Sequence, residues 1–343
     1  MLKLKKQFDE FYDSIRISDE AQDLKEKREI LQNDIEKNFP VELEKEDIDV
    51  SKTQIEIFDQ GSYHYHTTIN TEPYDRDVAI AIPLDIDAND DPRKLKQILR
   101  DSLNKVSSRT VVIKEPCVTV SYCESGEEWM HIDLPLYAKV NKQYYLARGK
   151  EFADNYSWEE ADPHGLNEKI DDSLKNNESL RQMVRFLKKW RDVQYANSTR
   201  DHEVPPSVGL TLLACELFTE VKDEGQHDDL AELMQIVQGI KNKFELMYDA
   251  DGNITSAKIH KLLPVKPYTD VFQKMLDSSD DYGVKFYRRI CTALENIKNA
   301  INADDDHQSS IYVRRVLGEE FELVDKDVKG NMDYSSRREH SFG

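Results

Sequence analysis

The feature that most constrains this chain is an acidic pair directly before an apolar, strand-like run. Asp75 and Asp77 precede Val78-Ala79-Ile80-Ala81-Ile82, a segment typical of a buried strand. Side chains alternate along a strand, so residues two apart share a face and both carboxylates project together. Paired oxygen ligands of this kind suit Mg²⁺. The sequence therefore predicts a magnesium site at the start of this strand.

A glycine-serine pair lies upstream of the two acids. Gly61-Ser62 follows the strand-like run Ile55-Glu56-Ile57-Phe58. Glycine lets the backbone approach a ligand closely, and serine offers a hydroxyl and an N–H group to a phosphate. A phosphate cradle beside a divalent-metal site is the arrangement that phosphoryl or nucleotidyl transfer needs.

A two-metal mechanism needs a third carboxylate, and Asp133 is the candidate. The segment 129–137 alternates, with apolar side chains on one face and Asp133 on the other. A β-rich run, 117–123, precedes it, which predicts a hairpin that sets Asp133 beside Asp77 in one sheet. A single acid on the polar face of a strand is usually only solvated, but the two upstream motifs favour a ligand here.

The ordered set of Gly-Ser, Thr67, Asp-x-Asp and a distant strand Asp resembles the polymerase-β-type nucleotidyltransferases. Two segments resemble the bacterial CD-NTases, and within them the bacterial cyclic GMP–AMP synthase branch: QGSYHYHT at 60–67 and HIDLPLYA at 131–138. CD-NTases make cyclic oligonucleotide second messengers in anti-phage defence. His66 stands in a slot where many relatives carry glycine.

The resemblance implies an α+β fold. It consists of a polymerase-β-like mixed sheet, a long N-terminal bracing helix and a C-terminal helical lobe, with the active site in the cleft between. We expect residues 1–165 to form the N-terminal helix and catalytic core, 166–324 the helical lobe, and 325–343 a flexible tail. The segment 155–170 is expected to be loop-like, and Ser18 to cap a second N-terminal helix.

The resemblance also implies the reaction and the residues that perform it. The catalytic residues, which would also bind two Mg²⁺ or Mn²⁺ ions, are Asp75, Asp77 and Asp133. The nucleotide-binding residues would be Gln60, Gly61, Ser62, Tyr65, Lys188 and Ser207. Tyr65 either stacks on a base or packs in the core. The substrates would be nucleoside triphosphates, ATP or GTP or both, and the product a cyclic di- or trinucleotide.

A predicted helix in the second half of the chain carries basic residues on one face. Arg181, Arg185 and Lys188 follow at spacings of four and three. Such a face is most often solvated, but an acidic chain that must hold triphosphates favours phosphate binding. The resemblance assigns this role to Lys188, whereas the two arginines rest on spacing. Ser207 opens the next helix after Pro205-Pro206, as a plain N-cap or as an anion ligand.

Composition excludes several other classes of protein. A net charge of −20, with 33% charged residues, argues against an extended nucleic-acid surface. Four cysteines without a Cys-x-x-Cys pair predict no zinc site and fit a reducing cytoplasm. No apolar run approaches the ~20 residues of a membrane span, so we expect a cytoplasmic protein without a membrane anchor.

Two rival functions and two partners remain open at this point. The rivals are a linear nucleotidyltransferase that modifies RNA ends, a small molecule or a protein, and a non-enzymatic binding module. Some CD-NTases are joined through a C-terminal residue to other molecules by a ubiquitin-transfer-like enzyme, and Gly343 suits that chemistry. The cyclic product implies a downstream effector.

Overall fold

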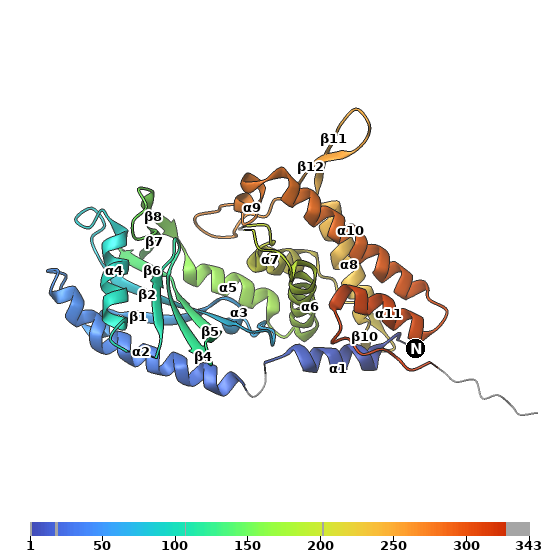
Figure 1. The fold of residues 1–343 in the computed structure, drawn as a ribbon, viewed down its shortest axis with the longest axis horizontal. Helices are drawn as coiled ribbons and strands as arrows, with labels where there is room; N and C mark the ends of the chain where they lie inside the picture. Colours follow the sequence, from blue (N-terminus) through green and yellow to red (C-terminus); the bar gives the residue numbers. More distant parts are fainter. Residues whose placement is uncertain (1, 18–19, 107, 201, 327–343) are drawn as a thin grey trace, which may run out of the picture.

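Two parts make up the molecule, a sheet with covering helices at one end and a helical bundle at the other (Figure 1). The structure is a computed structural model, and it describes residues 2–17, 20–106, 108–200 and 202–326. The predicted cap Ser18, most of the predicted tail and Gly343 lie outside the described residues.

The sheet is mixed, as the resemblance implies. Its strands are β1 (Glu56–Gln60), β2 (Tyr74–Pro83), β3 (Thr110–Ile113), β4 (Val118–Glu124), β5 (Glu127–Leu134), β6 (Leu136–Val140), β7 (Gln143–Gly149) and β8 (Tyr156–Ala161). They follow the order β3-β4-β5-β2-β6-β7-β8, with β1 paired to β2.

Strand β2 is the centre of this sheet. Its first half pairs parallel with β5, and its second half pairs parallel with β6, which follows β5 directly after Pro135. On β2 the run from Val78 to Ile82 is fully buried, as its apolar character predicts. The acidic pair therefore lies where β2 leaves the buried core.

Helices α2 (Glu20–Glu44) and α4 (Pro92–Leu103) lie against the sheet and share its core. Apolar residues seven or four apart form one stripe along α2, and they are almost fully buried: Leu24, Leu31, Ile35, Phe39 and Leu43. Helix α4 begins at Pro92, and the Asp91 side chain before it accepts a hydrogen bond from the Arg93 N–H at 3.0 Å. Amphipathic spacing thus accounts for how both helices pack.

The helical part has its own core. Its helices are α1 (Lys5–Ile15), α5 (Pro163–Leu174), α6 (Glu178–Tyr195), α7 (Ser207–Leu217), α8 (Asp229–Asn242), α9 (Gln273–Ser278), α10 (Asp280–Asn302) and α11 (Asp306–Leu317). Two hairpins, β9–β10 (Lys222–Asp223, Gln226–His227) and β11–β12 (Glu245–Tyr248, Ile254–Lys258), complete it. Phe8 and Phe11 of α1 pack on Phe186 of α6, with ring centroids 5.6 and 5.5 Å away. None of the helices in the described part of the chain has the length and apolar character that a membrane span requires.

Two expectations about the boundary between the parts are corrected. The segment expected to be a loop, 155–170, forms the edge strand β8 and the first half of α5. Asp162 caps α5 by accepting the Gly165 N–H at 2.8 Å, and Pro163 takes the first helical position. In addition, α1 packs in the helical core, whereas the predicted division placed it with the catalytic core.

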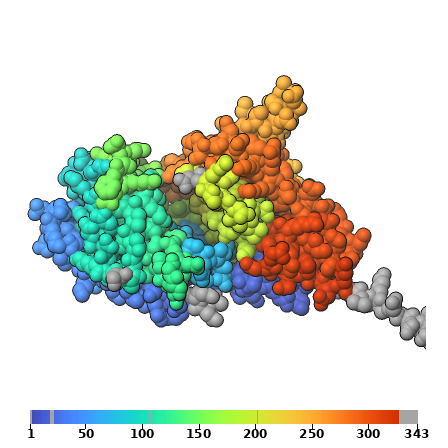
Figure 2. All heavy atoms as spheres, viewed as in Figure 1, coloured from blue at the N-terminus to red at the C-terminus, as the bar shows by residue number. Residues whose placement is uncertain are grey.

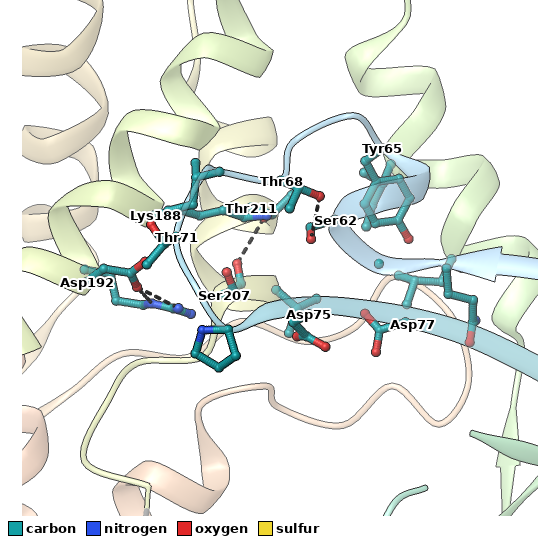
Figure 3. Close-up of a pocket in the computed structure, with 18 of the residues that line it drawn as sticks. Ser62, Tyr65, Thr68, Thr71, Asp75, Asp77, Lys188, Asp192, Ser207 and Thr211 are labelled. Atoms are coloured by element: carbon teal, nitrogen blue, oxygen red, sulfur yellow. Dashed lines mark hydrogen bonds and ion pairs between the residues drawn. The ribbon is translucent and has the colours of Figure 1, made fainter. Parts of the chain in front are cut away.

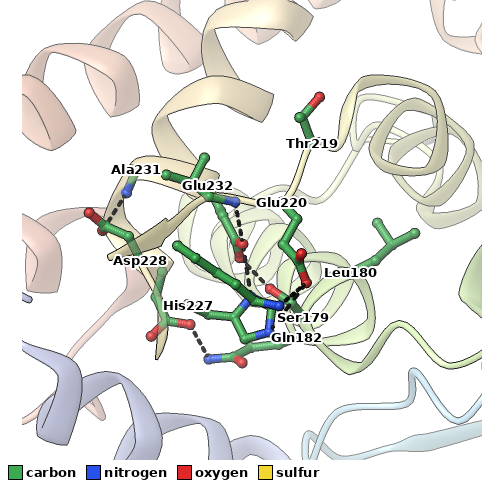
Figure 4. Close-up of polar contacts among 12 residues, drawn as sticks. Ser179, Leu180, Gln182, Thr219, Glu220, His227, Asp228, Ala231 and Glu232 are labelled. Atoms are coloured by element: carbon green, nitrogen blue, oxygen red, sulfur yellow. Dashed lines mark hydrogen bonds and ion pairs between the residues drawn. The ribbon is translucent and has the colours of Figure 1, made fainter. Parts of the chain in front are cut away.

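A buried polar network ties helices α1, α6 and α8 together (Figure 4). The fully buried carboxylate of Glu232 accepts hydrogen bonds from three donors: Ser179, the Val221 N–H and His227. Beside it, Asp229 accepts from Gln182 at 2.8 Å and pairs with Lys5 at 2.9 Å. Each buried acid therefore has its donors within the chain, as burial of charge requires.

Candidate active site

A cavity of about 550 Å³ lies between the sheet part and the helical part. The space-filling view shows the hollow between them (Figure 2). Eight of the nine predicted site residues line it: Gln60, Gly61, Ser62, Tyr65, Asp75, Asp77, Lys188 and Ser207. The ninth, Asp133, lies on the neighbouring strand β5. Residues distant in the sequence thus converge on one hollow.

The sheet register brings the three predicted carboxylates together. Asp75 and Asp77 share a face of β2, and in the parallel pairing with β5 Asp77 lies opposite Asp133 while Asp75 lies opposite His131. Ligand atoms of Asp75, His131 and Asp133 lie within 4.8 Å of one another. Asp133 also accepts the Thr119 hydroxyl at 2.5 Å. The hairpin predicted to place Asp133 beside Asp77 is confirmed.

Gly61 is the point where the backbone comes closest to Asp77. Its φ of +65° lies in the left-handed region, where side chains are disfavoured, and a Cβ added there would lie 2.0 Å from Asp77 Oδ2. Gly61 starts α3 (Gly61–His64), the short turn that follows β1. The glycine therefore lets this turn lie directly against the carboxylate. Figure 3 shows Ser62 of the turn and Asp77 of β2 at the same cavity.

The three carboxylates repel one another. Burial, together with the charges of Asp75 and Asp133, raises the pKa of Asp77 to about 8. Hard carboxylate oxygens brought together from two adjacent strands are the donor set that Mg²⁺ or Mn²⁺ requires. A divalent cation would remove the repulsion, so the residues fit such an ion.

Lys188 and Ser207 lie on the helical side of the cavity (Figure 3). Lys188 is 5% exposed, and its Nζ donates to the carbonyl and hydroxyl oxygens of Thr67 at 3.0 and 3.2 Å. Burial and the nearby charges of Arg191 and Arg185 lower its pKa to about 7. Both hydrogen-bond acceptors of this ammonium group are neutral oxygens, which favours an anionic ligand in the cavity.

The remaining predicted residues line the wall beside the glycine turn. The Ser62 hydroxyl lies 3.1 Å from that of Thr68, and Gln60 accepts the Tyr137 hydroxyl at 3.4 Å. Tyr65 is 6% exposed, and its hydroxyl donates to Asn167 at 2.8 Å. The tyrosine is thus part of the wall, and base stacking by its ring stays a prediction.

The predicted phosphate-binding role of Arg185 is wrong. This arginine is buried and donates to backbone carbonyls of the loop after α3, at Thr68 (3.2 Å) and at His66, and to the Tyr12 hydroxyl. His66 has a φ of +54°, which explains why glycine suits this position. Arg181 pairs with Glu178 instead of facing the cavity. Helical spacing predicted the shared face but not what each side chain meets there.

Sequence reasoning missed three residues of the site. The first is His131, whose Nε2 lies 3.3 Å from Asp75 Oδ1, and this hydrogen bond raises the pKa of the histidine. His131 also contacts Glu128. The other two are Arg191 and Asp192, which also line the cavity. They form an ion pair in which Arg191 Nη2 lies 2.8 Å from Asp192 Oδ1. The available signals were strand alternation, which puts His131 on the face of Asp133, and the i, i+3 spacing from Lys188 to Arg191.

Comparison with known proteins agrees with this geometry. Residues 55–137 match the family described as cyclic GMP-AMP synthase DncV-like, nucleotidyltransferase domain. The fold is similar to the crystal structure of Vibrio cholerae DncV cyclic AMP-GMP synthase, with a TM-score of 0.68 and 15% identity over 94% of this chain and 98% of that chain. The complex of that enzyme with the linear intermediate 5′ pppA(3′,5′)pG matches with a TM-score of 0.67 and 16% identity, over 92% and 96% of the two chains.

Escherichia coli DncV in its 3′-deoxy GTP bound form matches with a TM-score of 0.63 and 15% identity, over 90% of this chain and 93% of that chain. At such identities the structures establish a shared fold, which confirms the expected α+β architecture. The family match covers both the Gly-Ser turn and the Asp-x-Asp strand. Together they agree with the resemblance drawn from the motifs: residues 55–137 match a DncV-like nucleotidyltransferase domain, and the chain around it has the fold of DncV.

Proposed function

We propose that this chain joins nucleoside triphosphates, ATP or GTP or both, into a cyclic oligonucleotide second messenger. The observation that carries the proposal is that Asp75 and Asp77 line a cavity whose other side holds Lys188 and Ser207, while Asp133 lies opposite Asp77 on the next strand. Solved DncV structures with GTP and with pppA(3′,5′)pG, which share this fold, support triphosphates as substrates.

The roles of the residues follow from their chemistry. Asp75, Asp77 and Asp133 would hold two Mg²⁺ or Mn²⁺ ions. When bound, such ions neutralise phosphate charge and favour the alkoxide form of an attacking hydroxyl. Three residues would bind the β- and γ-phosphates: Ser62 in the glycine-serine turn, Lys188 through its positive charge, and Ser207 at the start of a helix.

The proposed step exchanges one phosphoester bond for another. The 3′-oxygen of the acceptor forms a bond to the α-phosphorus of the donor, and the bond from that phosphorus to pyrophosphate breaks. Asp133 would accept the proton of the 3′-hydroxyl, since it would lie nearest the attacking oxygen. A second transfer on the linear intermediate closes the ring.

The cellular setting that we propose is bacterial anti-phage defence in the cytoplasm, where the product would activate a downstream effector. Gly343 is the proposed attachment point for a ubiquitin-transfer-like partner enzyme, on the resemblance to CD-NTases that are joined to other molecules in this way. Mass spectrometry after incubation with such an enzyme tests this point. An adduct at Gly343 is expected, and an unmodified terminus would contradict it.

One experiment separates the proposed function from its rivals. The protein is incubated with Mg²⁺ and labelled ATP, GTP, CTP and UTP, and the products are then treated with phosphatase. A cyclic product keeps its label, because it has no terminal phosphate, whereas a linear product releases the label of its terminal phosphates. We expect a protected product that Asp75→Ala and Asp77→Ala abolish. A linear product would support the alternative transferase, and no product would favour the binding module.

A further inference from the structure

An irregularity in strand β5 shapes the edge of the carboxylate site. Strands β4 and β5 pair antiparallel, and their register shifts between Tyr122 and Cys123, so Trp129 has no partner on β4. Residues three apart on a regular strand face opposite sides. The extra residue of this bulge reverses the alternation and turns Glu128 to the side of His131. The Glu128 carboxylate accordingly lies 3.0 Å from His131 Nδ1.

The other side of the His131 ring faces the proposed metal site. Its Nε2 lies 3.3 Å from Asp75 Oδ1, across the parallel pairing of β2 and β5. The side chain of His131 is 18% exposed, whereas that of Asp75 is 57% exposed. A well-packed imidazole thus contacts a carboxylate that is otherwise largely free in solvent.

Two roles fit an imidazole at this place: a ligand of the cation, or a hydrogen-bond partner that orients Asp75. A metal ligand needs one ring nitrogen free for the ion. Here each nitrogen lies within hydrogen-bonding distance of a carboxylate, Glu128 on one side and Asp75 on the other. Hydrogen-bonded partners of this kind orient metal-binding carboxylates.

We propose that His131, itself fixed by Glu128, is a positioning residue that holds the Asp75 carboxylate in the orientation that binds a divalent cation. This inference rests on the metal-binding part of the proposed function. Without the ring, Asp75 would sample several rotamers in solvent, and the cation would have to order it on binding. Loss of such a partner lowers metal affinity by about 10- to 100-fold.

Binding of Mn²⁺ to the full chain, followed by EPR in the absence of nucleotide, tests the proposal. His131→Ala is expected to weaken binding by about 10- to 100-fold. His131→Gln should recover part of the affinity, because its amide N–H also donates to Asp75. Glu128→Ala should weaken binding less than His131→Ala. His260→Ala, at a half-exposed histidine paired with Asp270, is the matched control and should bind as wild type.

Two results would overturn the proposal. One is His131→Ala binding Mn²⁺ as tightly as wild type. The other is a ¹⁴N coupling from imidazole in the pulsed EPR spectrum of bound Mn²⁺ that disappears in His131→Gln, since this would make His131 a ligand. Wild-type binding that Asp77→Asn removes, without any product from triphosphates, would refute the proposed function and leave this inference standing.

Discussion

Two groups of acidic side chains in this chain differ in how their charge is compensated, one buried in the helical part and one at the cavity between the two parts. In the helical part, Glu232 and Asp229 on α8 are matched by donors from two helices, α1 and α6, and from the β9–β10 hairpin. In the cavity, Asp75 and Asp133 raise the pKa of Asp77 because they add negative charge to a group that burial already disfavours. Buried charge is costly unless it is compensated. The first group therefore stabilises the fold, whereas the charge of the second group is fully compensated only when a cation binds.

The largest expected effect comes from Asp77→Asn. Removing this carboxylate should lower the rate of product formation by at least about 10³-fold, since metal activation contributes several kcal/mol. The same change should raise the stability of the metal-free protein by about 1–2 kcal/mol, because it relieves like-charge repulsion. Product assays and urea unfolding in EDTA measure the two effects.

Asp251→Asn provides the control, because this acid is exposed in the turn of the β11–β12 hairpin. It should change neither quantity. A metal-free Asp77→Asn protein that is less stable than wild type would mean that the carboxylate is compensated within the chain. The contrast between the two acidic groups would then be lost.

Glu232→Ala should act in the opposite direction on stability. It leaves the Ser179 hydroxyl, the Val221 N–H and the His227 ring without their acceptor, which we expect to cost about 3 kcal/mol. The product formed per folded molecule should stay near the wild-type level. Thermal or urea unfolding checks the first effect, and an unchanged unfolding midpoint would contradict the role assigned to this network.

Gly61→Ala tests how closely the backbone must approach Asp77. The new Cβ would lie 2.0 Å from Asp77 Oδ2, so the turn or the carboxylate must move. A displacement of about 1 Å near the chemistry can cost about 100-fold in rate. Gly252→Ala is the matched control, because this glycine also has a positive φ, +82°, but no atom within 4 Å of its added Cβ. Equal rates for Gly61→Ala and wild type would show that the reaction does not need this close approach of the backbone to Asp77.

The smallest effect concerns Lys188 and pH. Its pKa is lowered to about 7, so the ammonium form is progressively lost above neutral pH. A triphosphate favours that charged form, and its binding at pH 8 in EDTA, where no cation displaces a proton from Asp77, should take up a proton. Affinity should therefore fall by up to about tenfold per pH unit above pH 7. Calorimetry in buffers of different ionisation enthalpy measures the uptake, and Lys188→Met should abolish it. Proton release in the wild type would contradict the assignment.

Sequence patterns predicted the parts of the fold that depend on local rules. Period-two alternation placed Asp75, Asp77 and Asp133 on a common side of neighbouring strands, and amphipathic spacing predicted the helices. The sequence patterns did not predict the edge strand β8 or the start of α5, although Asp162 and Pro163 are typical of a helix N-cap and first turn. Their polar composition looked like a loop, because an edge strand needs few apolar residues.

Long-range contacts were beyond local patterns. The basic spacing of Arg185 and Lys188 is the same whether a side chain meets phosphate or backbone, and only tertiary packing sends Arg185 to the loop at His66. The Glu128–His131 contact was equally hidden. It depends on a bulge at Trp129, and regular alternation would place these two residues on opposite faces.

The central claim is that Asp75, Asp77 and Asp133 jointly bind divalent cations beneath a triphosphate. A crystal structure with Mn²⁺ and a non-hydrolysable nucleoside triphosphate, recorded at the manganese absorption edge, tests it most directly. We predict anomalous peaks among these three carboxylates, with the triphosphate reaching Lys188 and Ser207. Manganese bound elsewhere, with Asp133 turned away from Asp75 and Asp77, would contradict the account.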